Sequence, residues 1–321
     1  MRVSILDDYV DTLRSLDCFR LLDGHDVTVL TDHVPDVDAL AGRLAGTEAL
    51  VLIRERTAIT AELLARLPGL RLISQSGAYP HVDVEACTRH GVLLCSRTGA
   101  AGPSYATAEL TWGLVLAAAR QIPVQQASLR AGTWQAGVGR TLRGRTLGVY
   151  GYGKIGRVVA GYGDAFGMDV LVWGSGAARE RAAADRRRVP ADRAAFFAGS
   201  DVLSVHLRLV EATRGVVTAA DLAAMRPDAL FVNTSRAGLV QPGALVAALD
   251  AGRPGTAAVD VFDEEPTTTD PLLARPNVIA TPHIGYVTRE DLEAQFRTVF
   301  GQVAAFAAGE PTNVVNPDAL R

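Results

Sequence analysis

The chain has 321 residues, of which 48% are hydrophobic, and it carries 32 basic against 35 acidic side chains for a formal net charge of −3. This length exceeds the roughly 250–300 residues at which a single hydrophobic core stops growing, so two domains are expected. The nearly balanced charge lacks the basic excess that is typical of nucleic-acid-binding proteins, so no nucleic-acid partner is expected.

The N-terminal segment and the cysteines predict a cytoplasmic protein. Met1–Asp8 is a short apolar run that leads directly into acids, without the long apolar region or cleavage site of a secretory signal. The most apolar stretch, Leu110–Ala119, is shorter than the roughly 20 residues that span a bilayer, so no membrane association is expected. Three cysteines without a CxxC pair indicate neither a disulfide framework nor a zinc site, and no metal is expected.

The first hundred residues alternate between short strand-like runs and helix-like segments. The predicted strands are Val3–Leu6, Val27–Leu30, Ala49–Ile53, Leu70–Ser74 and Val92–Cys95. Helix-like segments lie between some of them, at Val37–Leu44 and Ala61–Arg66. Strands that are separated by helices of this length indicate βαβ units and a parallel sheet.

A second and more complete series of strands follows a long helix. The helix is predicted over Ser104–Arg120, after the breaker cluster Gly99–Pro103, and an irregular stretch through Trp134 to Arg143 comes next. The strands of the second series are Leu147–Tyr150, Val170–Trp173, Val202–Val205, Leu230–Asn233, Ala257–Val261 and Val278–Ala280, and a last helix covers Arg289–Ala308. Six strands with intervening helices predict an α/β fold with a doubly wound parallel sheet that binds a dinucleotide.

A glycine-rich loop follows the first strand of this second series. Its residues are Gly151, Tyr152, Gly153, Lys154, Ile155 and Gly156, and the helix Arg157–Phe166 comes directly after them. In G-x-G-x-x-G, the first glycine permits a tight turn, the second lets the backbone approach a pyrophosphate, and the third allows close helix–strand packing. The strand–loop–helix setting makes this a predicted dinucleotide-binding loop, with phosphate at the helix N-terminus.

The end of the next strand bears on which coenzyme is used. An acid that binds the ribose hydroxyls of NAD is expected there, but Gly174 occupies the position and Ser175 follows. Arg179 and Arg181 lie just beyond and can accommodate a 2′-phosphate, or they are ordinary surface residues. Both NAD(H) and NADP(H) stay open, and the missing acid favours NADP(H).

Three further strand ends carry side chains of complementary chemistry. Arg236 follows Asn233-Thr234-Ser235, Glu265 follows the strand that ends at Val261, and His283 follows Thr281-Pro282. Reduction of a 2-oxo acid leaves an alkoxide that needs a proton, which His283 can donate and, in reverse, remove. Glu265 would favour the charged imidazole and raise its pKa. Arg236 can hold a carboxylate through two parallel hydrogen bonds and polarise the adjacent carbonyl.

Four motifs in this order resemble the D-isomer-specific 2-hydroxyacid dehydrogenases, in particular their phosphoglycerate dehydrogenase-like and hydroxypyruvate/glyoxylate reductase-like members. The motifs are Gly151 to Gly156, Val232-Asn233-Thr234-Ser235-Arg236, Asp260-Val261-Phe262-x-x-Glu265-Pro266 and Thr281-Pro282-His283-Ile284-Gly285. The resemblance covers essentially the whole chain. It implies an NAD(P)-dependent oxidoreductase that acts on a small 2-oxo or 2-hydroxy acid, with Arg236, Glu265 and His283 as catalytic residues.

The resemblance also implies a domain organisation and further site residues. It implies two Rossmann-like domains: a dinucleotide-binding domain at residues 101–286 and a discontinuous, flavodoxin-like substrate domain at residues 1–100 and 287–321. A homodimer through the coenzyme domains would be usual. Besides the glycine loop, Gly174, Ser175 and Arg179, the implied coenzyme contacts are Thr107, His206, Thr234, Ser235 and Asp260. The implied substrate contacts are Ser76, Gly77, Ala78 and Arg236.

The sequence departs from the family pattern at several positions. Gly174 replaces an aspartate, Arg208 replaces a common proline, and Ala237 replaces the glycine that usually follows the catalytic arginine. The segment from Ser76 to Asp83 follows the usual G-V-G-x-D only loosely. Two other functions stay open beside the hydroxyacid dehydrogenase: an NAD(H)-sensing, corepressor-like binding protein, and a dehydrogenase of another small anion such as phosphite.

Overall fold

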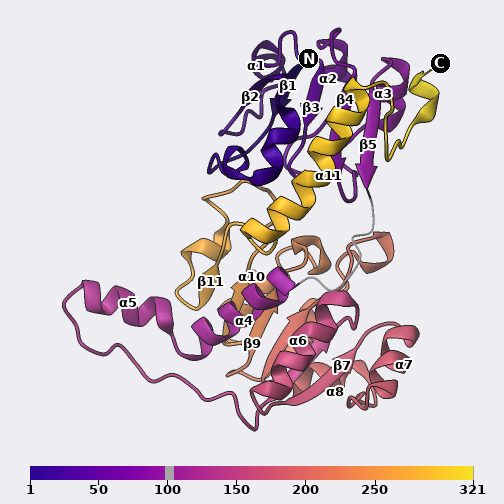
Figure 1. Ribbon diagram of the computed structural model, residues 1–321. Coiled ribbons are helices and arrows are strands. Elements are labelled where there is room, and N and C mark those ends of the chain that lie inside the picture. Colours follow the sequence, from indigo (N-terminus) through magenta and orange to yellow (C-terminus); the bar gives the residue numbers. More distant parts are fainter. Residues whose placement is uncertain (98–104, 321) are drawn as a thin grey trace. The chain divides into compact units, whose positions relative to one another are not determined.

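The computed structural model describes residues 1–97 and 105–320, and the chain divides into two compact units. Unit 1 comprises Met1–Ala101 and Val287–Arg321, and unit 2 comprises Gly102–Tyr286 (Figure 1). The predicted boundary at residues 100 and 101, the breaker cluster Gly99–Pro103 and the predicted helix start at Ser104 lie outside the described residues.

Unit 1 is built on a five-stranded parallel sheet. Its strands are β1 (Arg2–Ile5), β2 (Asp26–Val29), β3 (Ala49–Val51), β4 (Leu72–Ser76) and β5 (Leu93–Arg97), in the order β2-β1-β3-β4-β5. This is the flavodoxin-like order, as predicted. The helices of the unit are α1 (Val37–Arg43), α2 (Ala61–Ala65), α3 (Val84–Arg89) and α11 (Arg289–Ala307).

The helix starts of unit 1 follow from polar side chains that cap free backbone N–H groups. Asp36, Thr60, Asp83 and Thr288 each accept a hydrogen bond from the third residue of the helix that follows. Helix α11 buries an apolar face with the strands of unit 1, including Leu292, Phe296, Val299, Phe300 and Val303. The C-terminal helix therefore completes the core of the N-terminal sheet, because hydrophobic burial requires a cover on both faces of a parallel sheet.

Unit 2 is built on a six-stranded parallel sheet. The strands are β6 (Thr146–Tyr150), β7 (Asp169–Trp173), β8 (Val202–Val205), β9 (Leu230–Asn233), β10 (Thr256–Val259) and β11 (Val278–Ala280), in the order β11-β10-β9-β8-β6-β7. The helices are α4 (Tyr105–Ala119), α5 (Ile122–Arg130), α6 (Lys154–Ala165), α7 (Gly176–Ala184), α8 (Arg193–Gly199), α9 (Ala219–Ala224) and α10 (Ala244–Asp250). The strand order reverses beside β6, which is where open α/β sheets bind ligands.

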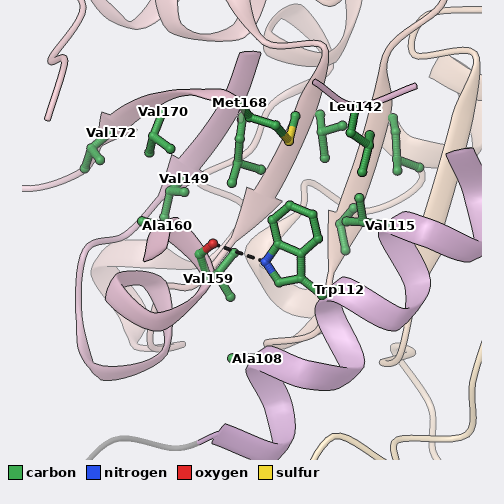
Figure 2. Packing of buried hydrophobic residues seen from close by; sticks show 14 of the residues in the cluster. Ala108, Trp112, Val115, Leu142, Val149, Val159, Ala160, Met168, Val170 and Val172 are labelled. Carbon is green, nitrogen blue, oxygen red and sulfur yellow. Dashed lines mark hydrogen bonds between the residues drawn. The ribbon is translucent and has the colours of Figure 1, made fainter. Parts of the chain in front are cut away.

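One side of this sheet is covered by α4 and α6, which pack against each other around Trp112 (Figure 2). The Trp112 indole is 4% exposed, and its Nε1 donates to the Val159 carbonyl at 3.1 Å. The buried Gly163 lets α6 approach the sheet closely, because a Cβ there would lie 2.7 Å from a methyl group of Leu147 on β6. This packing fixes α6, and with it the glycine loop at the N-terminus of α6.

The predicted strands all occur, with boundaries that differ by up to two residues. The stretch predicted to be irregular, Trp134 to Arg143, contains no helix or strand, but residues 122–130 form α5, a helix that was not predicted. None of the α5 residues is buried, so the sequence has no core-facing pattern there. Among the described residues, no helix combines the length and apolar character needed to cross a membrane.

Candidate active site

The glycine loop has the geometry that its sequence predicts. Gly151 has φ +104°, and a Cβ on it would lie 2.5 Å from the His206 carbonyl oxygen. A Cβ on Gly156 would collide with the Gly151 carbonyl oxygen, so this helix residue must be glycine for α6 to approach the loop. A Cβ on Gly153 would meet open space, and Gly153 is the N-cap of α6 without a side-chain cap. The start of α6 at Lys154 therefore lacks a side-chain cap, as expected of a helix N-terminus that binds a phosphate.

Tyr152 lies in the loop but turns its side chain into the core. The ring is 2% exposed, and its hydroxyl donates to Asp185 at 3.0 Å and receives the Arg187 Nε–H at 3.4 Å. Burial raises the pKa of this hydroxyl. A phosphate contact from Tyr152 would therefore come from its backbone, while the side chain anchors the loop.

Gly174 and Ser175 directly follow β7, and Arg179 and Arg181 lie on the helix α7 that comes next. A Cβ on Gly174 would lie 3.1 Å from the Ala178 Cβ, so a larger residue there needs α7 to shift. The Ser175 hydroxyl caps α7 by accepting the Ala178 N–H at 3.3 Å. The Arg179 guanidinium lies 4.8 Å from the centre of the Trp173 ring, and Arg181 donates to the Tyr152 carbonyl at 3.4 Å.

His206 follows β8, on the other side of β6 from β7. Its Nε2 lies 2.8 Å from the Ser204 hydroxyl, and burial lowers the pKa of the ring to about 3, so His206 is neutral. In the described part of the chain, its Nδ1 is buried without a hydrogen-bond partner. The His206 carbonyl lies against Gly151 of the glycine loop. An orphaned polar atom on this residue, together with an uncapped helix start and an open glycine in the loop, fits a polar ligand such as a dinucleotide, so the residues present suit the coenzyme.

Arg236 is positioned by the buried Asn233 at the end of β9. The Asn233 Oδ1 accepts the Ser235 N–H at 3.0 Å, and its Nδ2 donates to the Arg236 carbonyl at 2.9 Å. The Ser235 hydroxyl donates to the Val205 carbonyl at 2.8 Å, so its proton is used within the protein. Asn233 was not predicted as a functional residue, although a buried asparagine directly before Thr-Ser-Arg is the signal that reveals it.

His283 and Glu265 form a hydrogen-bonded pair. The His283 Nδ1 lies 2.5 Å from the Glu265 Oε2, and the two side chains are 25% and 31% exposed. The Glu265 Oε1 accepts the Phe262 N–H at 2.9 Å, which fixes the carboxylate from its other side. Burial raises the pKa of the Glu265 carboxyl, but the hydrogen bond and charge of His283 and the charge of Arg236 outweigh burial and leave the pKa below its ordinary value.

The backbone of His283 is left-handed, with φ +54°, and Asp260 holds the loop around it. The Asp260 carboxylate is fully buried and accepts hydrogen bonds from the Thr281 hydroxyl and from the Ile284 and Gly285 N–H groups, at 2.6 to 2.8 Å. Burial raises the pKa of Asp260. Beside the coenzyme contact that the family resemblance implies, the Asp260 carboxylate shapes the loop that carries His283.

Thr107 and Thr234 are also tied to these loops. The Thr107 hydroxyl donates to the Gly285 carbonyl at 2.9 Å, and the Thr234 hydroxyl lies 2.8 Å from that of Thr111 on α4. The structure therefore brings together, within unit 2, the Arg236 loop, the Glu265–His283 pair and the residues that hold them.

The predicted substrate loop lies in unit 1, at the end of β4. The Gly77 N–H and the Ser76 hydroxyl both donate to the Arg97 carbonyl, at 3.0 and 3.5 Å, so both are used within unit 1. Ser96 and Gln75 side chains hold the carbonyls of Gly77 and Ala78. Arg54 was not predicted here, yet its Nη1 lies 3.4 Å from where a Gly77 Cβ would be. The Arg-x-Arg-Thr run after β3 is the signal for it.

Fold and site together define a dinucleotide-binding α/β protein with an arginine, a glutamate and a histidine at the carboxyl ends of its strands. The family model described as D-isomer specific 2-hydroxyacid dehydrogenase, NAD binding domain, matches residues 112–285. A glyoxylate reductase from Thermococcus litoralis is 33% identical over 306 residues, which cover 91% of this chain and 87% of the relative.

Two solved structures are more similar still. An oxidoreductase structure from Ralstonia solanacearum has a TM-score of 0.96 and 50% identity, and the match covers 100% of this chain and 98% of that one. A phosphoglycerate oxidoreductase structure from Vibrio cholerae O395 has a TM-score of 0.92 and 51% identity, with 96% and 99% covered. The chain belongs to the D-isomer-specific 2-hydroxyacid dehydrogenase family, whose members are NAD-dependent oxidoreductases acting on CH–OH groups. The predicted family, fold class and enzyme class are confirmed.

Proposed function

We propose that this chain interconverts a small 2-oxo acid and the corresponding D-2-hydroxy acid, with His283 as acid and base, Glu265 as its partner and Arg236 as the carboxylate anchor. The observation that carries the proposal is the 2.5 Å contact between the His283 Nδ1 and Glu265. With Nδ1 engaged by an anion, Nε2 is the ring nitrogen that exchanges a proton with the substrate oxygen.

The proton balance follows from this pair. In the reducing direction, the carbonyl carbon gains a hydride and its oxygen gains the proton from His283. In the oxidising direction, His283 takes the hydroxyl proton as the carbon loses a hydride. Glu265, held ionised by its lowered pKa, stabilises positive charge on the ring in both directions.

Arg236 supplies the binding geometry. A guanidinium presents two parallel N–H groups to a carboxylate, which fixes the orientation of the neighbouring carbonyl as well as its position. Orientation of this kind is a large part of the rate of a bimolecular step. The Asn233 hydrogen bonds hold the backbone on both sides of this arginine.

The coenzyme would be held by the glycine loop and the helix start of α6, with His206, Thr234, Ser235 and Asp260 nearby. When bound, it supplies or accepts the hydride. The NAD-binding family match supports NAD(H). The Gly174 position carries no carboxylate to repel a 2′-phosphate, and Ser175, Arg179 and Arg181 follow it, which supports use of NADP(H) and a preference for it.

An activity assay with both coenzymes tests these points together. The purified chain should oxidise NADPH and NADH with glyoxylate, hydroxypyruvate or a larger 2-oxo acid, with the higher kcat/KM for NADPH. Arg179→Ala should lower kcat/KM for NADPH and leave that for NADH unchanged. A tenfold preference for NADH would contradict the NADP(H) assignment. Inactivity with every 2-oxo acid would contradict the hydroxyacid dehydrogenase. Oxidation of phosphite would then favour a dehydrogenase of that anion, and coenzyme binding without any turnover would favour the NAD(H)-sensing binding protein.

We further propose that the chain forms a homodimer through the segment 120–140 of unit 2. Helix α5 has no buried residue, and in Figure 1 it extends away from the strands of its unit. Ile122, Leu129, Trp134 and Val138 are 52%, 53%, 78% and 90% exposed. A run of large apolar side chains exposed in one segment is typical of a protein–protein interface.

Light scattering coupled to gel filtration tests the dimer. The wild-type chain should elute at twice the monomer mass, and the double variant Trp134→Ser, Val138→Ser should elute as a monomer. Val10→Ser, which removes an apolar side chain of unit 1 that is 71% exposed, is the matched control and should stay dimeric. A dimer in all three proteins would place the interface elsewhere.

A further inference from the structure

A chain of hydrogen bonds on α4 joins the loop of Arg236 to the loop of His283. Thr107 and Thr111 lie one turn apart on α4, which packs against β9, β10 and β11. The Thr107 hydroxyl donates to the Gly285 carbonyl at 2.9 Å, and Gly285 lies two residues after His283. The Thr111 hydroxyl donates to the Thr107 carbonyl at 2.7 Å and lies 2.8 Å from the Thr234 hydroxyl. Thr234 lies two residues before Arg236.

Counting protons gives the direction of each bond in this chain. A threonine hydroxyl has one proton, and a carbonyl oxygen can only accept. The Thr111 proton is used on the Thr107 carbonyl, so Thr111 accepts the proton of Thr234. Thr111 is fully buried and Thr234 is 6% exposed, so loss of the Thr111 hydroxyl would leave the Thr234 proton without an acceptor where water does not reach.

The His283 loop needs such a support because its backbone is strained. A histidine with φ +54° persists only where surrounding contacts over-determine it. Asp260 binds the Gly285 N–H at 2.8 Å, and Thr107 binds the carbonyl of the same residue. Both polar groups of the Gly285 backbone are therefore fixed, one by Asp260 directly after β10 and the other by Thr107 on α4.

We propose that Thr107 and Thr111 are positioning residues that set the His283 and Arg236 loops at a fixed separation. This inference rests on the proposed function, because the separation matters only if both side chains act on one substrate. It also gives Thr107 a role in addition to the coenzyme contact that the family resemblance implies. Helix α4 is then a common support for two loops that lie far apart in the sequence.

Isosteric variants test the proposal. Thr107→Val and Thr111→Val keep the shape and remove the hydroxyl, and each should lower kcat by about 10-fold to 100-fold, since small displacements of reacting groups have effects of that size. In Thr111→Val the KM for coenzyme should change less than about threefold, because Thr111 is not one of the implied coenzyme contacts. Thr107→Ser and Thr111→Ser restore the hydroxyl and should stay within about threefold of wild-type kcat.

Thr47→Val is the matched control. It removes another buried threonine hydroxyl, one that lies 2.7 Å from Ser4 Oγ in unit 1, and should leave kcat unchanged. A second readout does not depend on turnover: the imidazole NMR signal of His283, assigned among the six histidines by its loss in His283→Ala, should shift in Thr107→Val at one fixed pH and return in Thr107→Ser.

Each outcome decides the proposal. Wild-type kcat together with an unmoved His283 signal in Thr107→Val would overturn it. A raised coenzyme KM with unchanged kcat would make Thr107 a coenzyme contact only and would also overturn it. If the wild-type enzyme reduces no 2-oxo acid, the proposed function fails, and the NMR signal still reports whether Thr107 positions His283. If a valine variant does not fold, circular dichroism shows this, and Thr107→Ala and Thr107→Ser decide in its place.

Discussion

Both units of the chain carry a histidine beside a carboxylate at the carboxyl edge of a parallel sheet. In unit 1, the Nδ1 of His33 lies 3.0 Å from Asp7, and in unit 2 the Nδ1 of His283 lies 2.5 Å from Glu265. The two imidazoles are 21% and 25% exposed. Each pair also contains one left-handed residue, Asp7 with φ +60° and His283 with φ +54°. A histidine–acid contact therefore does not by itself define an active site.

The two histidine–carboxylate pairs differ in what else surrounds each carboxylate. The Asp7 side chain is 3% exposed, and its other oxygen accepts the Thr57 hydroxyl at 2.6 Å, so this carboxylate is buried within unit 1. Glu265 is 31% exposed and feels the charge of Arg236. The first strands of the two sheets differ as well, because β1 is followed by short turns and 3-10 helices, whereas β6 passes into a glycine loop and the 12-residue helix α6. The neighbours of a pair determine whether it can do chemistry.

Among the changes that test this difference between the pairs, removal of the imidazoles should give the largest difference in kcat. His283→Ala should lower kcat for 2-oxo acid reduction by about 10²-fold to 10⁴-fold, because the proton donor is lost. His33→Ala should leave kcat near the wild-type value, since in the described part of the chain its imidazole hydrogen-bonds to Asp7 in unit 1. Steady-state rates of both variants provide the measurement. Similar losses in the two variants would show that the pairs are not functionally different.

The sequence predicted the parts of this comparison that depend on local pattern. Strands Val202–Val205, Leu230–Asn233 and Val278–Ala280 occur with the predicted bounds, because apolar β-branched runs between turn residues define a buried parallel strand. The glycine loop was predicted from its own spacing, because the steric demands on Gly151 and Gly156 are local to the strand, loop and helix.

Contacts between segments that lie far apart in the sequence could not be predicted from the local sequence pattern. Thr107 and Gly285 are 178 residues apart, and no periodicity relates them. The same holds for His33 and Asp7, which meet only because β2 and β1 are neighbours in the sheet. Helix α5 was missed for a different reason: its apolar residues face away from the core of this chain, so the usual burial pattern is absent.

Substitution of Arg236, the proposed carboxylate anchor, should have a smaller effect, and this effect should be on the KM for the 2-oxo acid. Arg236→Lys keeps the positive charge near Glu265 but loses the planar fork, so KM for the 2-oxo acid should rise about 10-fold. Arg226→Lys, at a half-exposed arginine that pairs with Asp201, is the control and should change neither kinetic parameter. Initial rates over a range of 2-oxo acid concentrations give the answer. An unchanged KM in Arg236→Lys would remove Arg236 from carboxylate binding.

Substitution of the two carboxylates, Glu265 and Asp7, tests directly whether the two pairs have different roles. Glu265→Gln keeps the shape and removes the charge, so kcat should fall about 10-fold at pH 7, while Asp7→Asn should reduce stability without lowering kcat. The pKa of Glu265 in the folded protein lies below the ordinary 4.5. Stabilisation by the ionised carboxylate is therefore complete above the ordinary pKa and is lost as the pH falls through the lowered one.

Urea unfolding of wild type and Glu265→Gln at pH 5 and at pH 3 measures this dependence. The wild-type advantage in free energy of unfolding should be smaller at pH 3, because a protonated Glu265 resembles glutamine in charge. An advantage that grows as the pH falls would mean that the fold prefers the neutral acid. In that case Glu265 would resemble a buried structural carboxyl more than the ionised partner of a proton-transferring histidine.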